Sequence, residues 1–320
     1  MPVQSSPAHL ALDASRELVA RRKGVPMVVS LRDARGSGGG AAAGGDEGLA
    51  GLFEAYREQL HPDGADDEAA VIETLQAVAY ASLKGGAQGP GAAGRSGGRH
   101  RAVADDLRAG RFLRVMNYHN TPPSMRGELV TELGELAERY DTVTLDDLDR
   151  LTRTGAWHKE RQPLLPVFYE GYRDNYEVAA AACEEAGVVG WFFVCTGWLD
   201  TPVPEQYDFA LAHRIKLVAE NPRDERIAMT WDEIADLHRR GHVVTPHTAS
   251  HELAERVVTP QDVRREVTDP KRLMDAATGG DAACTAWLAG TSYTGGTGPD
   301  RALTDAGYRY LFANTMVQRI

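Results

Sequence analysis

The chain has 320 residues, which is enough for one large α/β domain or two unequal ones. Its formal net charge of -11 argues against nucleic-acid binding, because a basic face supplies most of that affinity. No apolar leader is found at the start, and no apolar run approaches the ~18 residues of a membrane span. We therefore expect a cytoplasmic protein that binds neither nucleic acid nor a membrane.

The first 110 residues are predicted to form an N-terminal extension that is mostly helical. Two low-complexity runs, at 36–48 and 85–99, are too poor in apolar residues to offset backbone entropy, so both are predicted to be flexible Gly-rich loops. The residue spacing also predicts three helices, at 5–22, 49–60 and 66–83. A buried strand is predicted at 25–31.

From residue 111 onward, short apolar segments alternate with amphipathic ones. Strands are predicted at 111–119, 142–145, 163–171, 188–199, 242–247, 284–290 and 308–314. Helices are predicted between them, as in SMRGELVTELGELAERY at 124–140 and TWDEIADLHRRG at 230–241. This alternation indicates parallel βαβ units, hence an open doubly wound sheet or a barrel, with the functional groups at the carboxyl ends of the strands.

Polar residues follow three of these strands: Tyr118-His119-Asn120, Tyr169-Glu170 and the segment HTASH at 247–251. The two histidines of HTASH stand at i and i+4, so on one helical turn both imidazoles could reach a single metal ion. With a carboxylate from another strand end, they would form a two-histidine, one-carboxylate set. Such a set suits a catalytic zinc with an open position, or non-haem iron(II).

Several segments resemble the polysaccharide deacetylase superfamily, also called the NodB-homology or carbohydrate esterase family 4 domain. They are GYRDNYEVAAAACEEAGVVGWFFVCTGWLD, TWDEIADLHRRGHVVTPHTASH and ALTDAGYRYLFAN, and the resemblance covers roughly residues 111–316. HTASH fits the family's H-[ST]-x-x-H metal motif in full. The chain is thus divided into the extension, 1–110, and a deacetylase-like domain, 111–320.

The resemblance implies a distorted (β/α) barrel, usually with seven parallel strands, and a divalent metal bound by one aspartate and two histidines. It also implies hydrolysis of an N-acetyl or related amide by a metal-bound water. Carried over by position, the ligands are Glu170, His247 and His251. The metal would be zinc first, with iron, cobalt, manganese or nickel as alternatives.

The site departs from the family pattern. Where the family has T-F-D-D-G, this chain has Val167-Phe168-Tyr169-Glu170-Gly171. Glu170 keeps the charge of the ligand aspartate on a stem longer by roughly 1.5 Å. Tyr169 replaces the aspartate that serves the family as general base, and a phenol with a pKa of about 10 is a poor base. The family's arginine-and-proline motif is replaced by AWLAGTSY, and no late Leu-x-x-His segment is found.

His119 is the candidate replacement acid or base, because the reference pKa of histidine suits proton transfer. Tyr169 would donate a hydrogen bond to the substrate or oxyanion. Trp198, Trp287 and Tyr293 could stack against a ring of the substrate, although such aromatic residues more often belong to a core.

Three functions remain open. The first is a metal-dependent hydrolase that cleaves an amide C–N bond of a small molecule or carbohydrate derivative. The second is iron(II) and oxygen chemistry on the same ligands, and the third is a non-catalytic binding protein. A homo-oligomer is compatible with each of them.

Overall fold

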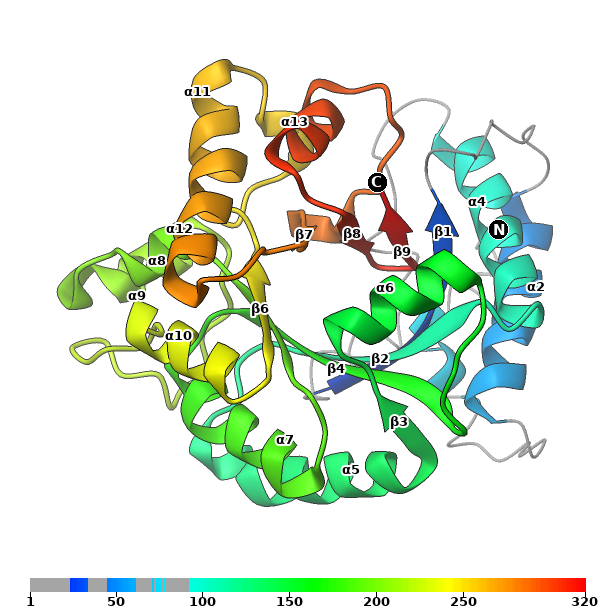
Figure 1. The fold of residues 1–320 in the computed structure, drawn as a ribbon, viewed down its shortest axis with the longest axis horizontal. Helices are drawn as coiled ribbons and strands as arrows, with labels where there is room; N and C mark the ends of the chain where they lie inside the picture. The colour runs from blue at the N-terminus through cyan, green and yellow to red at the C-terminus, as the bar shows by residue number, and fades with distance from the viewer. Residues whose placement is uncertain (1–23, 34–44, 62–70, 72, 76, 79–91) are drawn as a thin grey trace, which may run out of the picture.

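The computed structural model describes residues 24–33, 45–61, 71, 73–75, 77–78 and 92–320 (Figure 1). The helix predicted at 5–22 lies outside these ranges, as do residues 36–44 and 85–91 of the two Gly-rich runs. No helix within the described ranges is long and apolar enough to cross a membrane.

A single mixed sheet forms the centre of the molecule. Its path is β6-β5-β4-β2-β1-β9-β8-β7, and β3 pairs with β4 beside this path. The strands are β1 (Gly24–Asp33), β2 (Phe112–Tyr118), β3 (Tyr140–Thr142), β4 (Gln162–Glu170), β5 (Trp191–Val194), β6 (Val243–Pro246), β7 (Cys284–Ala286), β8 (Tyr310–Ala313) and β9 (Met316–Arg319).

Parallel pairing joins β2 to β4, β4 to β5, β5 to β6 and β7 to β8. β1 and β9 are parallel to each other and antiparallel to their outer neighbours β2 and β8. The sheet curls into a nearly closed barrel, as the sequence predicts, but with nine strands and one reversed pair (Figure 1). Neither the reversed pair nor β9 is predicted from the sequence.

Helices cover the outside of this barrel. They are α2 (Gly45–Leu60), α4 (Ala92–Arg108), α5 (Arg126–Arg139), α6 (Leu145–Thr154), α7 (Ala180–Ala186), α8 (Thr196–Leu199), α9 (Val203–Ala212), α10 (Trp231–Arg239), α11 (Pro260–Val263), α12 (Asp269–Thr278) and α13 (Gly298–Ala306). Short 3₁₀ turns occur at η1 (Pro123–Met125), η3 (Ala254–Arg256) and η5 (Leu288–Gly290). Two π turns, η2 (Asn175–Ala179) and η4 (Arg264–Thr268), lead into α7 and α12.

Strand alternation divides the core into an inner and an outer layer. Along β4, Val167 belongs to the inner cluster, while Phe168 packs outward in the cluster that includes α5 and α7. Leu148 and Leu151 of α6 join the inner cluster, so α6 covers the amino end of the barrel. The carboxyl ends of the parallel strands are left for the functional groups.

Side chains bridge the gap between the two terminal strands of the path. The hydroxyl of Thr245 in β6 donates to the carbonyl of Cys284 in β7. The hydroxyl of Thr285 donates back to the carbonyl of Pro246 over 3.1 Å. These bonds take the place of a backbone ladder between β6 and β7.

The N-terminal segment is more ordered and more integrated than its composition suggests. The prediction of loops is wrong for residues 45–48, which begin α2, and for 92–99, which form the first half of α4. Packing of α4 against α2 and β1 outweighs the low helix propensity of glycine there. Because β1 lies between β2 and β9, the extension supplies a strand of the sheet, and the division at residue 110 stays a prediction.

We expect the N-terminal helices and the barrel to unfold together. Leu107 of α4 is fully buried in the cluster that includes Phe112 of β2 and Met316 of β9. Leu107→Ala should lower the free energy of unfolding by about 2–5 kcal/mol in one cooperative transition, because it leaves a cavity. Arg101→Ala, at an exposed position of the same helix, is the control. Two separate transitions in urea, with only the first one shifted, would contradict this expectation.

Candidate metal centre

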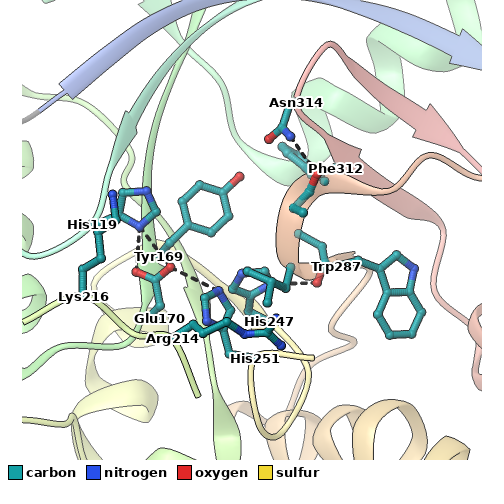
Figure 2. Close-up of a pocket in the computed structure, with 14 residues that line it drawn as sticks. His119, Tyr169, Glu170, Arg214, Lys216, His247, His251, Trp287, Phe312 and Asn314 are labelled. Carbon is teal, nitrogen blue, oxygen red and sulfur yellow. Dashed lines mark hydrogen bonds and ion pairs between the residues drawn. The ribbon is translucent and has the colours of Figure 1, made fainter. Parts of the chain in front are cut away.

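Three ligand-type side chains converge at the carboxyl ends of β4 and β6. Glu170 is the last residue of β4, His247 follows β6, and His251 lies four residues later. All three are buried, and one donor atom from each lies within 4.8 Å of the others. Figure 2 shows them turned toward one another at the floor of a pocket. The strand ends therefore bring together the three residues that the sequence analysis proposes as ligands.

The backbone at Glu170 breaks the alternation of β4. Regular pleating would send Tyr169 inward and Glu170 outward, yet both line the same pocket. Glu170 has φ 71° and Gly171 has φ 92°, so two consecutive residues adopt left-handed conformations. A side chain on Gly171 would meet Cγ1 of Val194 at 2.6 Å. Glycine is needed at this turn, which carries the Glu170 carboxylate back over the barrel.

The HTASH segment forms a turn rather than the helical turn expected from its spacing. Thr248 has φ 61° and His251 has φ 54°, which are left-handed values incompatible with a helix. The buried Glu266 carboxylate holds the turn by accepting bonds from the amides of Ala249 and Ser250, at 3.0 and 2.9 Å, and from the Ser250 hydroxyl at 2.8 Å. The strain at the turn supports an arrangement built for function.

Backbone carbonyls fix the orientation of both histidines. Nδ1 of His247 lies 2.7 Å from the carbonyl of Ala286, and Nδ1 of His251 lies 2.9 Å from that of His213. Because a carbonyl oxygen only accepts, each Nδ1 must carry the hydrogen. Each ring therefore keeps Nε2 as its unprotonated nitrogen, and Nε2 of His251 lies 3.5 Å from Oε1 of Glu170. Outer partners of this kind are typical of metal-ligating histidines.

The charge states also suit metal binding. Burial raises the pKa of Glu170, but His119, His251 and His247 together outweigh burial and lower this pKa to about 2. Burial, together with the adjacent His251, lowers the pKa of His247 to about 3. A carboxylate and neutral imidazoles are the forms that bind a divalent cation.

His119 is the fourth polar group of the site. It follows β2, and its Nδ1 lies 2.8 Å from Oε2 and 3.0 Å from Oε1 of Glu170. The carboxylate is an acceptor, so Nδ1 of His119 carries the hydrogen and Nε2 is left as a base in the neutral ring. His119 lies outside the set of three donors that share one site. The structure places it as a partner of Glu170 at the pocket surface.

A pocket of about 260 Å³ lies above these residues, lined by His119, Tyr169, Glu170, His247, His251 and Trp287 among others. The ring of Tyr169 packs 5.3 Å from that of Phe193 and 5.3 Å from that of His247, measured between centroids. Figure 2 shows its hydroxyl pointing away from Glu170 into the pocket.

Two aromatic residues proposed from the sequence do not line this pocket. Trp198 is fully buried, its Nε1 donates to the carbonyl of Gln206 over 2.9 Å, and its ring meets that of Tyr172 edge-on. Tyr293 packs against the outer cluster that includes Trp287 and α13. The structure therefore places both in the packing around the site rather than at its surface.

Two groups of pocket residues were not predicted from the sequence. Arg214 and Lys216 come from the loop after α9, while Phe312 and Asn314 come from β8 and the turn that follows it. No motif marks the loop, whose only signal is an apolar residue between two cations in RIK. Phe312 lies in a predicted strand, but the register that points it into the pocket cannot be derived from composition.

The donor set passes a chemical test for a metal ion. Among the residues that the structure describes, Glu170, His247 and His251 form the only group that meets the distance requirement. They offer one carboxylate and two imidazole nitrogens, which suit zinc or another divalent first-row metal. The fold and this buried triad define a barrel with a two-histidine, one-carboxylate site at its carboxyl end.

Residues 159–311 match the model of the family described as polysaccharide deacetylase. The matched segment, a little under half of the chain, is similar to this family. The matched segment includes Glu170, His247 and His251, and the departure at Tyr169 lies within it as well.

Solved structures of deacetylases are similar to this chain at low identity. Streptococcus pyogenes deacetylase PplD in complex with acetate has 14% identity and a TM-score of 0.49, covering 64% of this chain and 90% of that one. IcaB from Ammonifex degensii has 18% identity and a TM-score of 0.46, covering 64% and 85%. The BpsB deacetylase domain from Bordetella bronchiseptica has 18% identity and a TM-score of 0.42, covering 59% of this chain and 82% of that one. No curated protein sequence matches the chain.

The triad should bind one divalent metal ion per chain. Loss of a residue that only positions a metal ligand lowers metal affinity by roughly 10–100-fold. Replacing His247 and His251 together by alanine should lower the affinity by more than this, because two ligands are lost. The measurement is metal content by mass spectrometry after purification without chelators or metal affinity resin. His238→Ala, at an exposed helix position, is the matched control. Equal metal content in the double variant and the wild type would refute this site.

Proposed function

We propose that this protein is a metal-dependent hydrolase that cleaves an amide C–N bond, N-acetyl or similar, of a small molecule or carbohydrate derivative. The observation that carries the proposal is the buried Glu170, His247 and His251 set at the carboxyl end of a deacetylase-family barrel. The three side chains are pre-oriented by hydrogen bonds, His247 and His251 to backbone carbonyls and Glu170 to His119, as expected of a working site. Zinc is the metal that best suits this donor set.

A divalent metal bound there would supply a Lewis acid that polarises the amide carbonyl and lowers the pKa of water. Glu170 would be a ligand of that metal and also accepts the hydrogen bond from Nδ1 of His119, which lies 2.8 Å from Oε2 and 3.0 Å from Oε1. That hydrogen bond fixes the hydrogen on Nδ1 of His119 and leaves Nε2 to accept a proton from the attacking water. Glu170 thus orients the base as the aspartate does in a Ser-His-Asp triad.

Tyr169 takes a different role from the aspartate that it replaces. Its phenol is a hydrogen-bond donor and points into the pocket, where the carbonyl oxygen of a bound amide would gain charge (Figure 2). His119 could return its proton to the departing amine, since one imidazole can serve as base and then as acid. A second residue acting as the acid would then not be needed.

The size of the pocket favours a small substrate. Its volume of about 260 Å³ lies just below the usual range of roughly 300–1,000 Å³ for ligand sites. Such a pocket admits one acylated sugar or amino-acid unit. A long polymer would need an open groove with several subsites.

The zinc-loaded protein should release the acyl group from at least one member of a panel of N-acetylated amines, amino sugars and amino acids. The assay detects free amine, with and without oxygen. Turnover without oxygen would exclude iron and oxygen chemistry, which the same donor set can also support. Turnover that needs iron and consumes oxygen would refute hydrolysis. Silence over the whole panel, with metal bound, would favour a binding protein.

His119→Ala should lower kcat by roughly 10²–10⁴-fold, the usual contribution of a general base, and change KM much less. Added imidazole should restore part of the rate, because a free base can occupy the space that the ring leaves. The matched control, His238→Ala, should keep full activity. A loss that imidazole cannot restore, accompanied by loss of metal, would show that His119 only positions Glu170.

A further inference from the structure

Two cationic side chains line the pocket that holds the triad. Arg214 and Lys216 lie in the loop between α9 and α10, and both are exposed on the side of the pocket near His119, Glu170 and His251 (Figure 2). The opposite wall carries Trp287, Phe312 and Asn314. Neither Arg214 nor Lys216 takes part in the proposed hydrolysis.

The loop presents both cations because it is fixed at three points. The carbonyl of His213 accepts from Nδ1 of His251, which ties the loop to a proposed metal ligand. The buried side chain of Ile215 packs into the cluster with Tyr172. The carbonyl of Lys216 accepts from the Tyr172 hydroxyl over 2.6 Å. With residue 215 pointing inward, the side chains on either side of it point out toward the pocket.

The backbone of Arg214 is constrained as well. Its φ of 60° is left-handed, a conformation that costs about 1–3 kcal/mol for a residue other than glycine. The loop keeps an arginine there although Gly or Asn would fit with less strain. Strain of this kind is found where the position of a side chain or carbonyl is functional.

The charges of the two cations are poorly compensated within the protein. Arg214 contacts Glu252 at 3.4 Å, and the same carboxylate also lies 3.8 Å from Arg256. The ammonium of Lys216 has no hydrogen bond or ion pair to any residue that the structure describes. Glu170 is the only carboxylate among the pocket residues, and it is engaged by His119 and His251.

A positive pocket is not a consequence of composition. The chain carries a net charge of -11, so a random surface hollow would be negative or neutral. A bound divalent cation would make the pocket more positive still. A positively charged site attracts anions. Binding of a neutral sugar would gain nothing from this charge.

We propose that Arg214 and Lys216 form an anion-binding subsite beside the metal centre. The ligand is an N-acyl compound that carries a carboxylate or phosphate close to its amide bond. Arg214 presents a planar fork to such a group and Lys216 a point charge, a pairing that suits either anion. The subsite requires only the structure of the pocket, whereas the assignment to a substrate rests on the proposed hydrolase function.

The first test measures binding without turnover. Inorganic phosphate and acetate are titrated by calorimetry into the zinc-loaded wild type, Arg214→Gln, Lys216→Gln and the double variant. Each single change should weaken the binding of at least one anion about tenfold, since hydrogen bonds to charged groups are worth that much. Arg239→Gln, an exposed arginine of α10 that lies outside the pocket, should have no effect. Melting temperatures confirm that the variants fold.

The second test compares matched substrates. N-acetylglycine is paired with the neutral N-acetylglycinamide, and N-acetylglucosamine 6-phosphate with N-acetylglucosamine. The wild type should prefer the charged member of at least one pair in kcat/KM by tenfold or more, and the double variant should lose that preference. The pair that shows it identifies the anion as a carboxylate or a phosphate.

Two results would overturn the subsite. One is anion binding that persists in the double variant and disappears when the metal is removed, since the metal then holds the anion. The other is an equal or greater rate on the neutral members of both pairs. Anion binding that depends on Arg214 and Lys216, without any hydrolysis, would support the subsite. It would count against the proposed hydrolase function but not against the subsite.

Discussion

The burial of one carboxylate governs the architecture of the site. Glu170 is 2% exposed, and an ionised carboxyl group is not stable in such a place without compensation. The imidazoles of His119, His247 and His251 surround it and keep its pKa low. These side chains follow three different strands, so the charge is satisfied only when β2, β4 and β6 are aligned at their carboxyl ends. The fold and the site therefore depend on the same alignment.

The closure of the barrel depends on the same region. β6 and β7 lack a backbone ladder, and the contacts between them include the hydroxyl bonds of Thr245 and Thr285. The third bond across the gap is that from Nδ1 of His247 to the carbonyl of Ala286. A proposed metal ligand is thus also part of the seam of the barrel. A metal that binds His247 would strengthen the seam, because ligand binding to the native state stabilises it.

The sequence was most informative where one residue type or one period decides the structure. β4 and β5 follow from their apolar runs, and the candidate ligand set follows from HTASH and a strand-end glutamate. The sequence was least informative where tertiary contacts determine the local structure. Residues 92–99 are helical despite three glycines because α4 packs against α2 and β1, and pairing with β2 and β9 places β1 in the sheet. The pocket cations could not be predicted, because their direction is set by Ile215, His213 and Tyr172 together.

Strand register accounts for the change at Tyr169. Tyr118 of β2 pairs with Phe168 of β4, so His119 lies beside Tyr169, one strand away. The two rings are 5.7 Å apart between centroids. A base lost from β4 can therefore be supplied from β2 with only a small displacement of the proton acceptor. Since His119 contacts the carboxylate that we propose as a metal ligand, the proposed role of His119 moves the base from position 169 to the end of β2. The phenol then fills the inner position, where its ring packs on Phe193 and its hydroxyl points away from Glu170 (Figure 2).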